Sequence, residues 1–284
     1  MTNKLSVVLA TRNEEKNIEK CLNSVKTIAD EIIVVDEYSM DKTREIAQKL
    51  GAKVYLEKHH EIFHITKQIA LDKASGDWIL QLDADEEVTP MLVGEIKLVI
   101  NGRTPVIHDG RKRKLFARHQ RLIEMRDGKI GKDEGEIVAY FIPRKNMFLG
   151  SPLIHAGVYP DGVIRLVKRG KGRFPQKSVH EQMVIDGKVS WVSGDLEHND
   201  SPNLKRYFER LNRYTDLHAE ELRQKKAPKN ILYFIYYSLF KPFFVFIKLF
   251  VYNKGFLDGI GGFFWSLFSS WHYPIAYFKY LTKR

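Results

Sequence analysis

The sequence is poor in cysteine, with a single one, Cys21, in 284 residues. A disulfide framework is therefore excluded, and at 44% hydrophobic residues the chain can bury a large core without one. It contains no internal repeat, P-loop, paired-cysteine metal motif or nucleophile elbow. Its start, MTNKLSVVLA, lacks the basic segment, apolar run and small-residue cleavage site of a secretory signal, so we expect a cytoplasmic protein.

Acidic residues are also in deficit, since the net charge is +11. Lysines and arginines outnumber acids by five in residues 102–135, by four in 203–230 and by five in 231–284. The rest of the chain is slightly acidic. Such basic segments attract nucleic acid, an anionic membrane or an anionic acceptor molecule.

The first part of the chain alternates between two patterns. Short apolar runs predict strands, and apolar residues at helical spacing, such as Ile18, Cys21, Leu22 and Val25, predict helices. We expect strands at 4–10, 31–35, 53–56 and 78–82, and helices at 13–26, 43–50 and 66–74. Strands that alternate with helices imply an α/β fold with a mostly parallel sheet and right-handed crossovers.

Carboxylates follow the predicted strands. The run WILQLDADEE ends in four acids, and two of them, Asp83 and Asp85, share one side. Because ligands bind at the carboxyl ends of parallel strands, Glu14, Asp36 and Asp83 should converge on one crevice. Paired carboxylates there suit a hard divalent cation held jointly with a phosphate-bearing ligand. The alternative is a strand end followed by a helix cap, because EEVTP at 86–90 is typical of a helix N-terminus.

Three blocks of this region resemble the start of family 2 glycosyltransferases, the inverting nucleotide-sugar enzymes with the GT-A fold. They are SVVLATRNEEKNIEKCLNSV, EIIVVDEYSMDKT and ASGDWILQLDADEE. Later blocks, YFIPRKNMFLG, YPDGVIRLVKR, VHE and LEH, are similar to the bacterial branch that builds lipopolysaccharide core or related surface glycans. One departure is EYSM at 37–40, where many members have Asp-Gly-Ser-Thr.

The resemblance implies a donor site for a nucleotide-sugar, most simply a UDP-sugar. Thr11, Glu14 and Asp36 would line the nucleoside pocket, Asp83 would close it, and Lys67 would approach the ribose or the phosphates. For Thr11 and Glu14 the alternative is an ordinary helix start, in which Thr11 lies near the N-cap and Glu14 is stabilised in the first turn by the helix dipole. For Lys67 it is a solvated lysine on an amphipathic helix.

The resemblance also implies a metal site. Asp85 would bind Mn²⁺ or Mg²⁺, which bridges the two phosphates of the donor. His198, at the end of the predicted strand VSWVSGDLEH, stands where some relatives have a further metal ligand. An imidazole beside carboxylates suits Mn²⁺ better than Mg²⁺. The alternative is a structural histidine.

An inverting transfer needs one base to remove the proton of the acceptor hydroxyl. The resemblance assigns this role to Glu181, beside which His180 could orient it; the alternative is an exposed glutamate after a short strand. Asp161 is the substitute candidate, although Pro-Asp-Gly is also a strong turn signal. Arg165 and Lys168 alternate with apolar residues, so we expect both to project from one strand face and to meet diphosphate or an anionic acceptor.

The domain organisation follows from these patterns. We expect a GT-A domain at 1–200 with a charged insert at 101–136, which is either a partly helical acceptor flap or disordered. An amphipathic linker helix should occupy 201–230. Residues 231–284 should form aromatic-rich interfacial membrane helices, since lysines, glycines and prolines interrupt both apolar stretches. The alternatives are a membrane hairpin and a buried helical subdomain.

Together these features predict a metal-dependent inverting hexosyltransferase at the cytoplasmic face of the plasma membrane, acting on a glycolipid or lipopolysaccharide-core acceptor. A polyprenyl-phosphate sugar synthase of the same fold, which needs no base, is one alternative. A non-catalytic membrane or nucleic-acid binding module is another. The tail is too apolar and aromatic for an RNA-binding face, so we expect no nucleic-acid partner.

Overall fold

The computed structural model describes residues 3–175 and 182–282. The chain forms two compact units. Unit 1 comprises Met1–Arg144 and Pro160–His198, and unit 2 comprises Lys145–Tyr159 and Asn199–Arg284. Unit 2 therefore combines a segment of 145–159 with the C-terminal helices, whereas the sequence pattern places that segment in the N-terminal domain.

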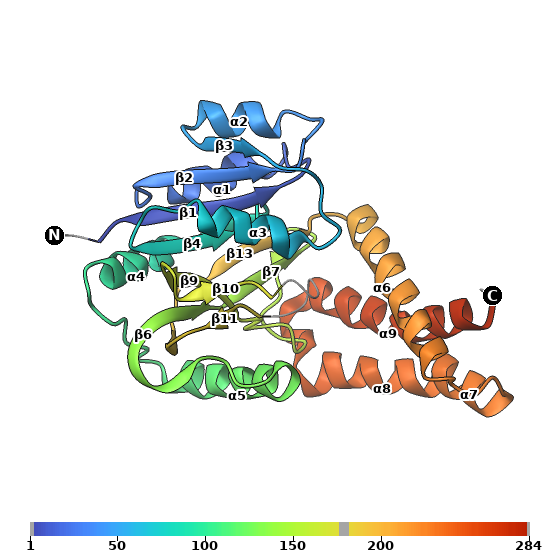
Figure 1. The fold of residues 1–284 in the computed structure, drawn as a ribbon. Helices are drawn as coiled ribbons and strands as arrows, with labels where there is room; N and C mark the ends of the chain where they lie inside the picture. Colours follow the sequence, from blue (N-terminus) through green and yellow to red (C-terminus); the bar gives the residue numbers. More distant parts are fainter. Residues whose placement is uncertain (1–2, 176–181, 283–284) are drawn as a thin grey trace. The chain divides into compact units, whose positions relative to one another are not determined.

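The centre of unit 1 is a seven-stranded sheet with the strand order β12-β6-β9-β4-β1-β2-β3 (Figure 1). Its strands are β1 (Leu5–Thr11), β2 (Glu31–Asp36), β3 (Lys53–Leu56), β4 (Trp78–Leu82), β6 (Lys132–Ile142), β9 (Val163–Lys168) and β12 (Lys188–Trp191). Only β9 runs antiparallel to its neighbours, β4 and β6. The predicted α/β class with a mostly parallel sheet is confirmed.

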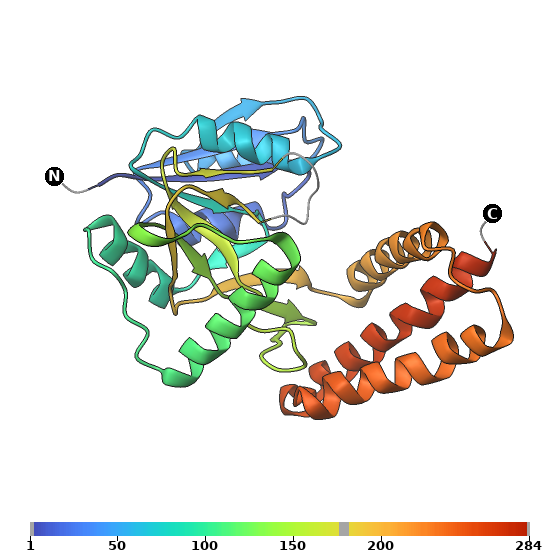
Figure 2. The same ribbon diagram turned by 60° about the horizontal axis from the view of Figure 1, so that its bottom comes forward.

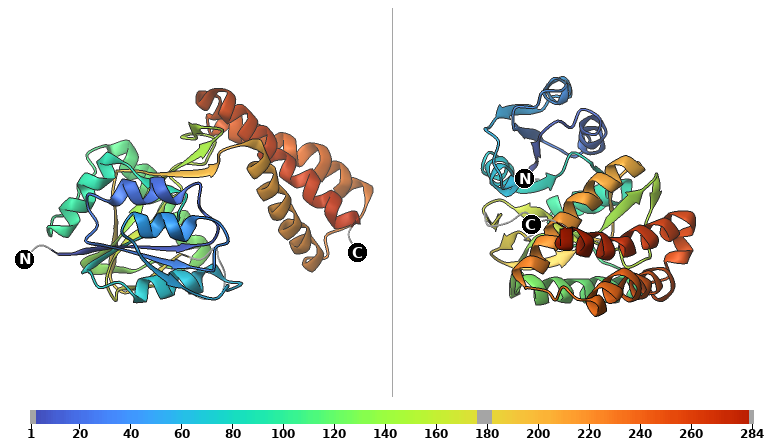
Figure 3. Two further views of the ribbon diagram at one scale, coloured as in Figure 1. Left: turned by 90° about the horizontal axis from the view of Figure 1, so that it is seen from above. Right: turned by 90° about the vertical axis from the view of Figure 1, so that its right-hand side faces the viewer.

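Helices cover both faces of this sheet (Figures 1 and 3). On one face, α1 (Ile18–Val25), α2 (Thr43–Lys49) and α4 (Pro90–Ile100) share a single hydrophobic core with the strands. Helix α1 buries Ile18, Cys21, Leu22 and Val25, as their spacing predicts. On the other face, α3 (Phe63–Asp72) packs against β1, β2 and β4.

The insert at 101–136 is ordered. It forms α5 (Gly110–Asp127), which Asp109 caps through two backbone N–H groups, and the first part of β6. Trp191 of β12 lies between Phe116 of α5 and Phe141 of β6, with ring centroids 4.6 Å and 4.7 Å away. The Trp191 Nε1–H also donates to Gln120 at 3.0 Å. Aromatic stacking therefore holds this helix to unit 1.

Two short antiparallel pairings complete unit 1. Strand β5 (Glu86–Val88) pairs antiparallel with the first half of β13 (Leu196–Ser201), which sets His198 opposite Glu86. Strands β10 (Gly172–Arg173) and β11 (Val184–Ile185) also pair antiparallel.

Unit 2 is mainly helical. It contains β7 (Arg144–Phe148), which begins at the last residue of unit 1's first segment, β8 (Ser151–Pro152), α6 (Leu204–Gln224) and α9 (Gly259–Thr282). Helix α6 buries a face that packs on α9 through aromatic clusters around Tyr207 and Tyr277. The predicted amphipathic helix thus belongs to the helical unit.

Residues 231–252 are continuously helical: α7 (Ile231–Ile235), the π-helical η1 (Tyr236–Phe240), α8 (Lys241–Ile247) and the π-helical η2 (Lys248–Tyr252). The 3₁₀ turn η3 (Gly255–Asp258) then leads into α9, and α8 and α9 lie side by side (Figure 2). Lys241 and Pro242 lie inside this helix and do not end it. By length and composition alone, Ile231–Tyr252 could cross a membrane, and its span is not buried.

Candidate active site

The predicted acids lie along one edge of the sheet. Because β1 pairs in parallel with both β2 and β4, the register aligns Thr11 with Asp36 and Leu9 with Leu82, so Asp83 emerges at the same edge as Asp36. The backbones at Asp36 and Asp83 are two strand spacings apart, roughly 10 Å. This edge is the carboxyl end of the parallel strands, where open α/β sheets bind their ligands.

Thr11 and Asp36 form a buried pair at this edge. The Thr11 Oγ1–H donates to Asp36 Oδ2 at 2.8 Å, and Ser39 donates to both carboxylate oxygens from its N–H and its hydroxyl. Asp36 is thereby fixed in orientation. Thr11 ends β1 and does not cap a helix, whereas the Glu14 side chain accepts from Asn17 just before α1. Glu14 lies before the helix, whose first turn contains Glu19 instead, so the roles of Thr11 and Glu14 in the donor site stay predictions.

The turn that departs from the family pattern contains a residue in the left-handed region. Tyr38, which stands where many relatives have glycine, has a φ of 50°. A bulky residue in the left-handed region is strained, and such strain is concentrated at functional sites. Ser39 is retained, and it supplies the hydrogen bonds to Asp36.

Asp83 is held by two cations. Lys67 Nζ from α3 lies 2.5 Å from Asp83 Oδ1, and Arg165 Nη2 from β9 lies 2.5 Å from Oδ2. The structure therefore brings together three residues that the sequence assigns to the donor site. Burial acts to raise the pKa of Asp83, but the charges of Arg165 and Lys67 hold it well below its usual range. Burial also lowers the pKa of Lys67.

Glu86 and Arg144 also belong to this cluster, and the sequence analysis does not assign either of them to the site. Glu86 is fully buried and accepts from Arg165 Nη2 at 2.7 Å and from Arg144 Nη1 at 3.4 Å. Its Oε2 also accepts the backbone N–H of Asp83 at 3.0 Å. A sequence signal for such a buried ion cluster is an arginine directly after an apolar run: Arg144 follows FIP and Arg165 follows VI. A buried arginine requires a carboxylate partner.

Asp85 lies beside His198. Their side chains, Asp85 Oδ2 and His198 Nε2, are 3.6 Å apart, and both are mostly buried. Burial acts to raise the pKa of Asp85, but the contact with His198 lowers it below its ordinary value. The β5–β13 pairing creates this contact, because it sets His198 opposite the residue that follows Asp85.

The donor set at this position fits a divalent cation that a substrate helps to bind. Within residues 3–175 and 182–282, no cluster of three or more histidine, cysteine or acidic side chains could hold a metal ion. Asp85 and His198 offer one carboxylate and one imidazole. Mg²⁺ and Mn²⁺ commonly bind through one or two protein ligands together with substrate phosphates and water. The two residues suit that kind of site.

A pocket of about 610 Å³ opens beside the ion cluster. Four of the predicted site residues, Lys67, Asp83, Asp161 and Arg165, line it. Asp161 has a φ of 37°, consistent with the turn that Pro-Asp-Gly predicts, and its Oδ2 accepts from Arg144 Nη2 at 2.7 Å. Six other predicted site residues do not appear in the described lining of this pocket: Thr11, Glu14, Asp36, Asp85, Lys168 and His198. Glu181 and His180 lie outside the described residues.

One expectation for this site is wrong. Arg165 and Lys168 do not share a strand face: Arg165 reaches Gln81, Asp83 and Glu86, whereas Lys168 pairs with Glu136 at 2.8 Å. The register sets Lys168 opposite Trp78, at the start of β4, and Asp83 follows the other end of that strand. Because side chains alternate along a strand, residues three positions apart point to opposite faces.

Comparison with known proteins identifies the family. Residues 6–146 match the family described as Glycosyl transferase family 2. The chain is 46% identical over 99 residues to an uncharacterised glycosyltransferase of Rickettsia bellii, a match that covers 35% of this chain and 33% of that protein. The chain thus aligns with about a third of that relative's length.

A longer match is to the lipopolysaccharide core biosynthesis glycosyltransferase LpsC of Rhizobium meliloti, with 26% identity over 266 residues, 91% of this chain and 85% of LpsC. Among solved structures, glucosyl-3-phosphoglycerate synthase of Mycobacterium tuberculosis in complex with Mn²⁺ and UDP-glucose aligns over 80% of this chain and 81% of that chain, with 19% identity and a TM-score of 0.42. The family match and the curated relatives show that this chain belongs to glycosyltransferase family 2.

Proposed function

We propose that the chain is a metal-dependent, inverting hexosyltransferase that uses UDP-hexose and glycosylates a hydroxyl group of a lipid-anchored glycan such as lipopolysaccharide core. The observation that carries this proposal is the Asp85–His198 pair beside the cation-held Asp83, at the carboxyl edge of a family 2 sheet. The similarity to LpsC, whose name assigns it to lipopolysaccharide core biosynthesis, supports the choice of acceptor.

The chain's own residues would prepare the donor. Asp85 and His198 would hold Mn²⁺ or Mg²⁺, and the bound cation would neutralise the charge that develops on the departing nucleoside diphosphate. Arg165 would help to hold the same group, since among the described residues its buried Nε–H has no hydrogen-bond acceptor. A phosphate oxygen is the kind of acceptor that such a donor requires.

Proton removal from the acceptor is assigned to Glu181, with Asp161 as the substitute. Asp161 lines the 610 Å³ pocket together with Asp83, and the ion pair with Arg144 orients its carboxylate. A hydroxyl nucleophile bound in this pocket would therefore lie near the Asp161 carboxylate. Phosphate attack, as in a polyprenyl-phosphate sugar synthase, needs no such acid.

The proposed location is the cytoplasmic face of the plasma membrane, with the chain bound as a peripheral or monotopic protein. The helix at Ile231–Tyr252 is apolar, long enough to span, and not buried. Lys241 and Lys248 interrupt its apolar surface, and tyrosines are frequent along it. Lysines and tyrosines on an apolar helix are typical of the headgroup region.

The metal and the donor can be tested with the full chain in detergent. Calorimetric titration with UDP should show binding that Mn²⁺ strengthens, and Asp85→Asn should remove this strengthening. Asp133→Asn is the matched control, because Asp133 is an exposed acid that pairs with Lys129. Undiminished Mn²⁺-dependent binding or transfer in the Asp85 variant would refute the metal assignment. Screening UDP-, GDP- and ADP-sugars for hydrolysis then identifies the donor.

The base is tested separately. Glu181→Gln should reduce transfer to a glycan acceptor by about 100-fold or more while UDP binding is kept, because general base catalysis contributes roughly that much. Asp161→Asn should have a smaller effect. Near-normal turnover in the Glu181 variant, with a polyprenyl phosphate as the working acceptor, would favour the lipid-phosphate alternative.

A further inference from the structure

A second cavity adjoins the candidate catalytic pocket. Its volume is about 950 Å³, at the upper end of the roughly 300–1,000 Å³ that ligand pockets occupy. The two cavities share five of their lining residues: Arg126, Asp127, Phe174, Gln182 and Met183. The two hollows are therefore neighbouring parts of one groove that begins at Asp83 and Asp161. We call the larger part the outer groove.

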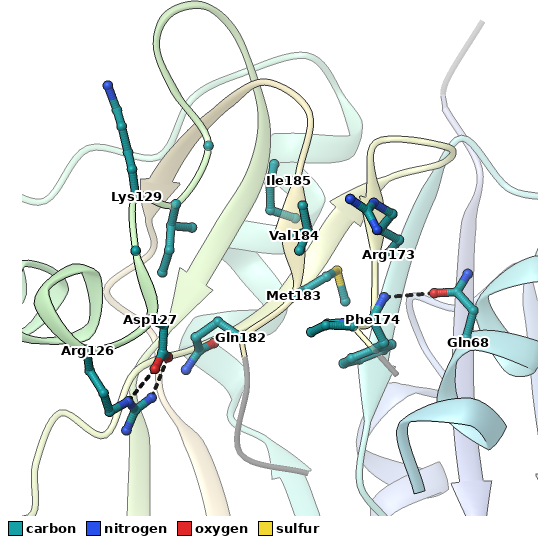
Figure 4. A pocket seen from close by; sticks show the side chains of 14 residues that line it. Gln68, Arg126, Asp127, Lys129, Arg173, Phe174, Gln182, Met183, Val184 and Ile185 are labelled. Atoms are coloured by element: carbon teal, nitrogen blue, oxygen red, sulfur yellow. Dashed lines mark hydrogen bonds and ion pairs between the residues drawn. The ribbon is translucent and has the colours of Figure 1, made fainter. Parts of the chain in front are cut away.

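Two walls enclose the outer groove. One is the end of α5 and the turn that follows it, residues 126–131, and the other is the β10 end with Arg173 and Phe174 (Figure 4). Met183, Val184 and Ile185 lie between them. The insert at 101–136 thus supplies one whole wall of a cavity that reaches the reaction site.

The floor of the outer groove is apolar and fixed. Ile130, Phe174, Met183 and Ile185 are mostly buried and expose only an edge to the groove. Phe174 packs on His64 with centroids 4.9 Å apart, and its backbone N–H donates to Gln68 at 2.8 Å. A rigid aromatic and aliphatic floor with polar groups at the rim is typical of sites that bind the apolar faces of sugar rings.

The rim carries an excess of positive charge. Arg126 lies on one side, where Asp127 binds its Nε and Nη2 at 2.6 Å each. Lys129 lies on the same side and pairs with the exposed Asp133, which is not among the lining residues. Arg173 lies on the other side (Figure 4), and within the described part of the chain it has no carboxylate in ion-pair distance. The rim thus carries three cations and one acid.

We propose that the outer groove binds the part of the acceptor glycan that adjoins the reacting sugar, and that it selects glycans carrying a phosphate or carboxylate group. Arg173 would meet the anionic group from one side and Arg126 from the other. Guanidinium groups are the preferred partners of both anions. The inference rests on the proposed function, since it defines the chemistry of that function's acceptor.

The probes are three soluble oligosaccharides: a phosphorylated, deacylated lipopolysaccharide core, the same core dephosphorylated by phosphatase and with its carboxyl groups reduced to alcohols, and trigalacturonate. Binding to the full chain in detergent is measured by calorimetry. The phosphorylated core or trigalacturonate should bind about tenfold or more tightly than the dephosphorylated core, because a charge-assisted hydrogen bond contributes that much. Comparison of the two acidic probes shows which anion the groove takes. Equal affinity for all three would overturn the proposal.

The site of binding is tested by Arg173→Gln with Lys171→Gln as its matched control. Lys171 precedes the same hairpin and carries the same charge, but it pairs with Asp186 and does not line the outer groove. Arg173→Gln should weaken binding of the preferred acidic probe by about tenfold, and Lys171→Gln should leave it unchanged. Equal effects of the two substitutions would refute the assignment of Arg173.

A second variant tests the groove without changing its charge. Val184→Trp places a large side chain on the partly exposed β11 surface of the outer groove, and it should abolish binding of the acidic probe. Unchanged affinity would exclude this cavity as the site. UDP binding is measured in parallel. If the unsubstituted chain does not bind UDP, the proposed function is contradicted. If it binds UDP but does not discriminate between the acidic and neutral glycans, only the assignment of the outer groove is contradicted.

Discussion

The ion cluster at the end of β4 joins stability to function. Its two acids, the partly buried Asp83 and the fully buried Glu86, share Arg165, while Lys67 and Arg144 complete the set from other elements. Removing one partner of a buried pair leaves an uncompensated charge, which costs far more than the pair contributes as a whole. The cluster should therefore tolerate substitution poorly, although its members are polar and lie at a ligand-binding edge.

Arg165→Gln should lower the free energy of unfolding by about 3–5 kcal/mol, because Arg144, at the longer distance, would be the one cation left beside Glu86 among the described residues. Lys168→Gln on the same strand is the matched control and should cost at most about 1 kcal/mol, because its pair with Glu136 is exposed to solvent. Urea unfolding followed by circular dichroism measures both. Similar losses in the two variants would contradict the description of the cluster.

Glu31 should make the folding stability of unit 1 depend on pH. Burial acts to raise its pKa, but hydrogen bonds from Ser6, Ser75 and Lys53 bring the pKa down to about 2 from an ordinary value of 4.5. As pH falls, the unfolded chain takes up this proton first. The stabilisation is thus complete above about pH 4.5 and is lost as pH falls towards 2.

Glu31→Gln should accordingly be less stable than the unsubstituted chain at neutral pH. The difference in the free energy of unfolding should shrink between pH 4.5 and 2, the window set by the two pKa values. Urea titrations at a series of pH values measure it. Parallel stability curves for the two proteins across this window would show that Glu31 does not carry the predicted linkage.

The sequence predicts the positions of these residues better than their partners. Asp36 and Asp83 follow apolar runs, so a parallel sheet must bring them to one edge. That Lys67 and Arg165 neutralise Asp83 depends on where α3 and β9 pack, which local patterns do not encode. The expectation for Lys168 failed for a simpler reason, since alternation along a strand separates it from Arg165.

At the scale of elements, α5 depends on few contacts. Of its 18 residues, only Phe116 and Ile123 are buried. Its attachment to the sheet relies on Trp191, whose side chain bonds Gln120 from 71 positions away. Gly162 packs directly against the Trp191 ring, since a Cβ at this position would lie 2.1 Å from it. The helix that forms one wall of the outer groove is thus held mainly by contacts around Trp191.

Phe116→Ala should release this helix. Truncating a buried phenylalanine costs about 3–5 kcal/mol, so amide hydrogen exchange should accelerate in residues 110–127 but not in β1 or β2. Leu115→Ala, at a partly exposed neighbouring position, is the matched control and should leave exchange nearly unchanged. Slow exchange in α5 of the Phe116 variant would mean that other contacts hold the helix.

Element prediction succeeded where apolar periodicity is strong and failed where it is weak. The strands β1 to β4 and the apolar face of α1 follow directly from it. Helix α5 has almost no apolar periodicity, since charged residues occupy half of its positions, and the sequence therefore indicated a charged insert that is either partly helical or disordered. Two-residue strands such as β10 and β11 carry no periodic signal at all.

At the scale of the whole molecule, the two units differ in the surface that they present. In unit 2, the helix at 231–252 exposes large apolar side chains along its length, among them Phe243 and Phe244 at 60% and 61% exposure. Contiguous exposed apolar surface of this kind marks a membrane or protein interaction site. The neighbouring lysines favour an anionic bilayer, at about 1 kcal/mol for each cation near the surface.

Co-sedimentation with vesicles that contain anionic lipid tests this surface in the full chain. Replacing Phe243 and Phe244 by serine should weaken vesicle binding on the order of 100-fold, because burying each phenylalanine contributes about 1.5–3 kcal/mol. Replacing Leu122 and Met125 by serine is the matched control, since these side chains are equally apolar and exposed but lie on α5 of unit 1.

The lipid charge and the apolar contact can be separated in the same assay. High salt should weaken binding of the unsubstituted chain to anionic vesicles, because screening removes the lysine contribution, but the phenylalanine contribution should remain. If both serine pairs bound vesicles like the unsubstituted chain, the apolar helix would not be the membrane contact. Loss of self-association in the Phe243 and Phe244 variant, measured by analytical ultracentrifugation, would then assign its surface to a second copy of the chain.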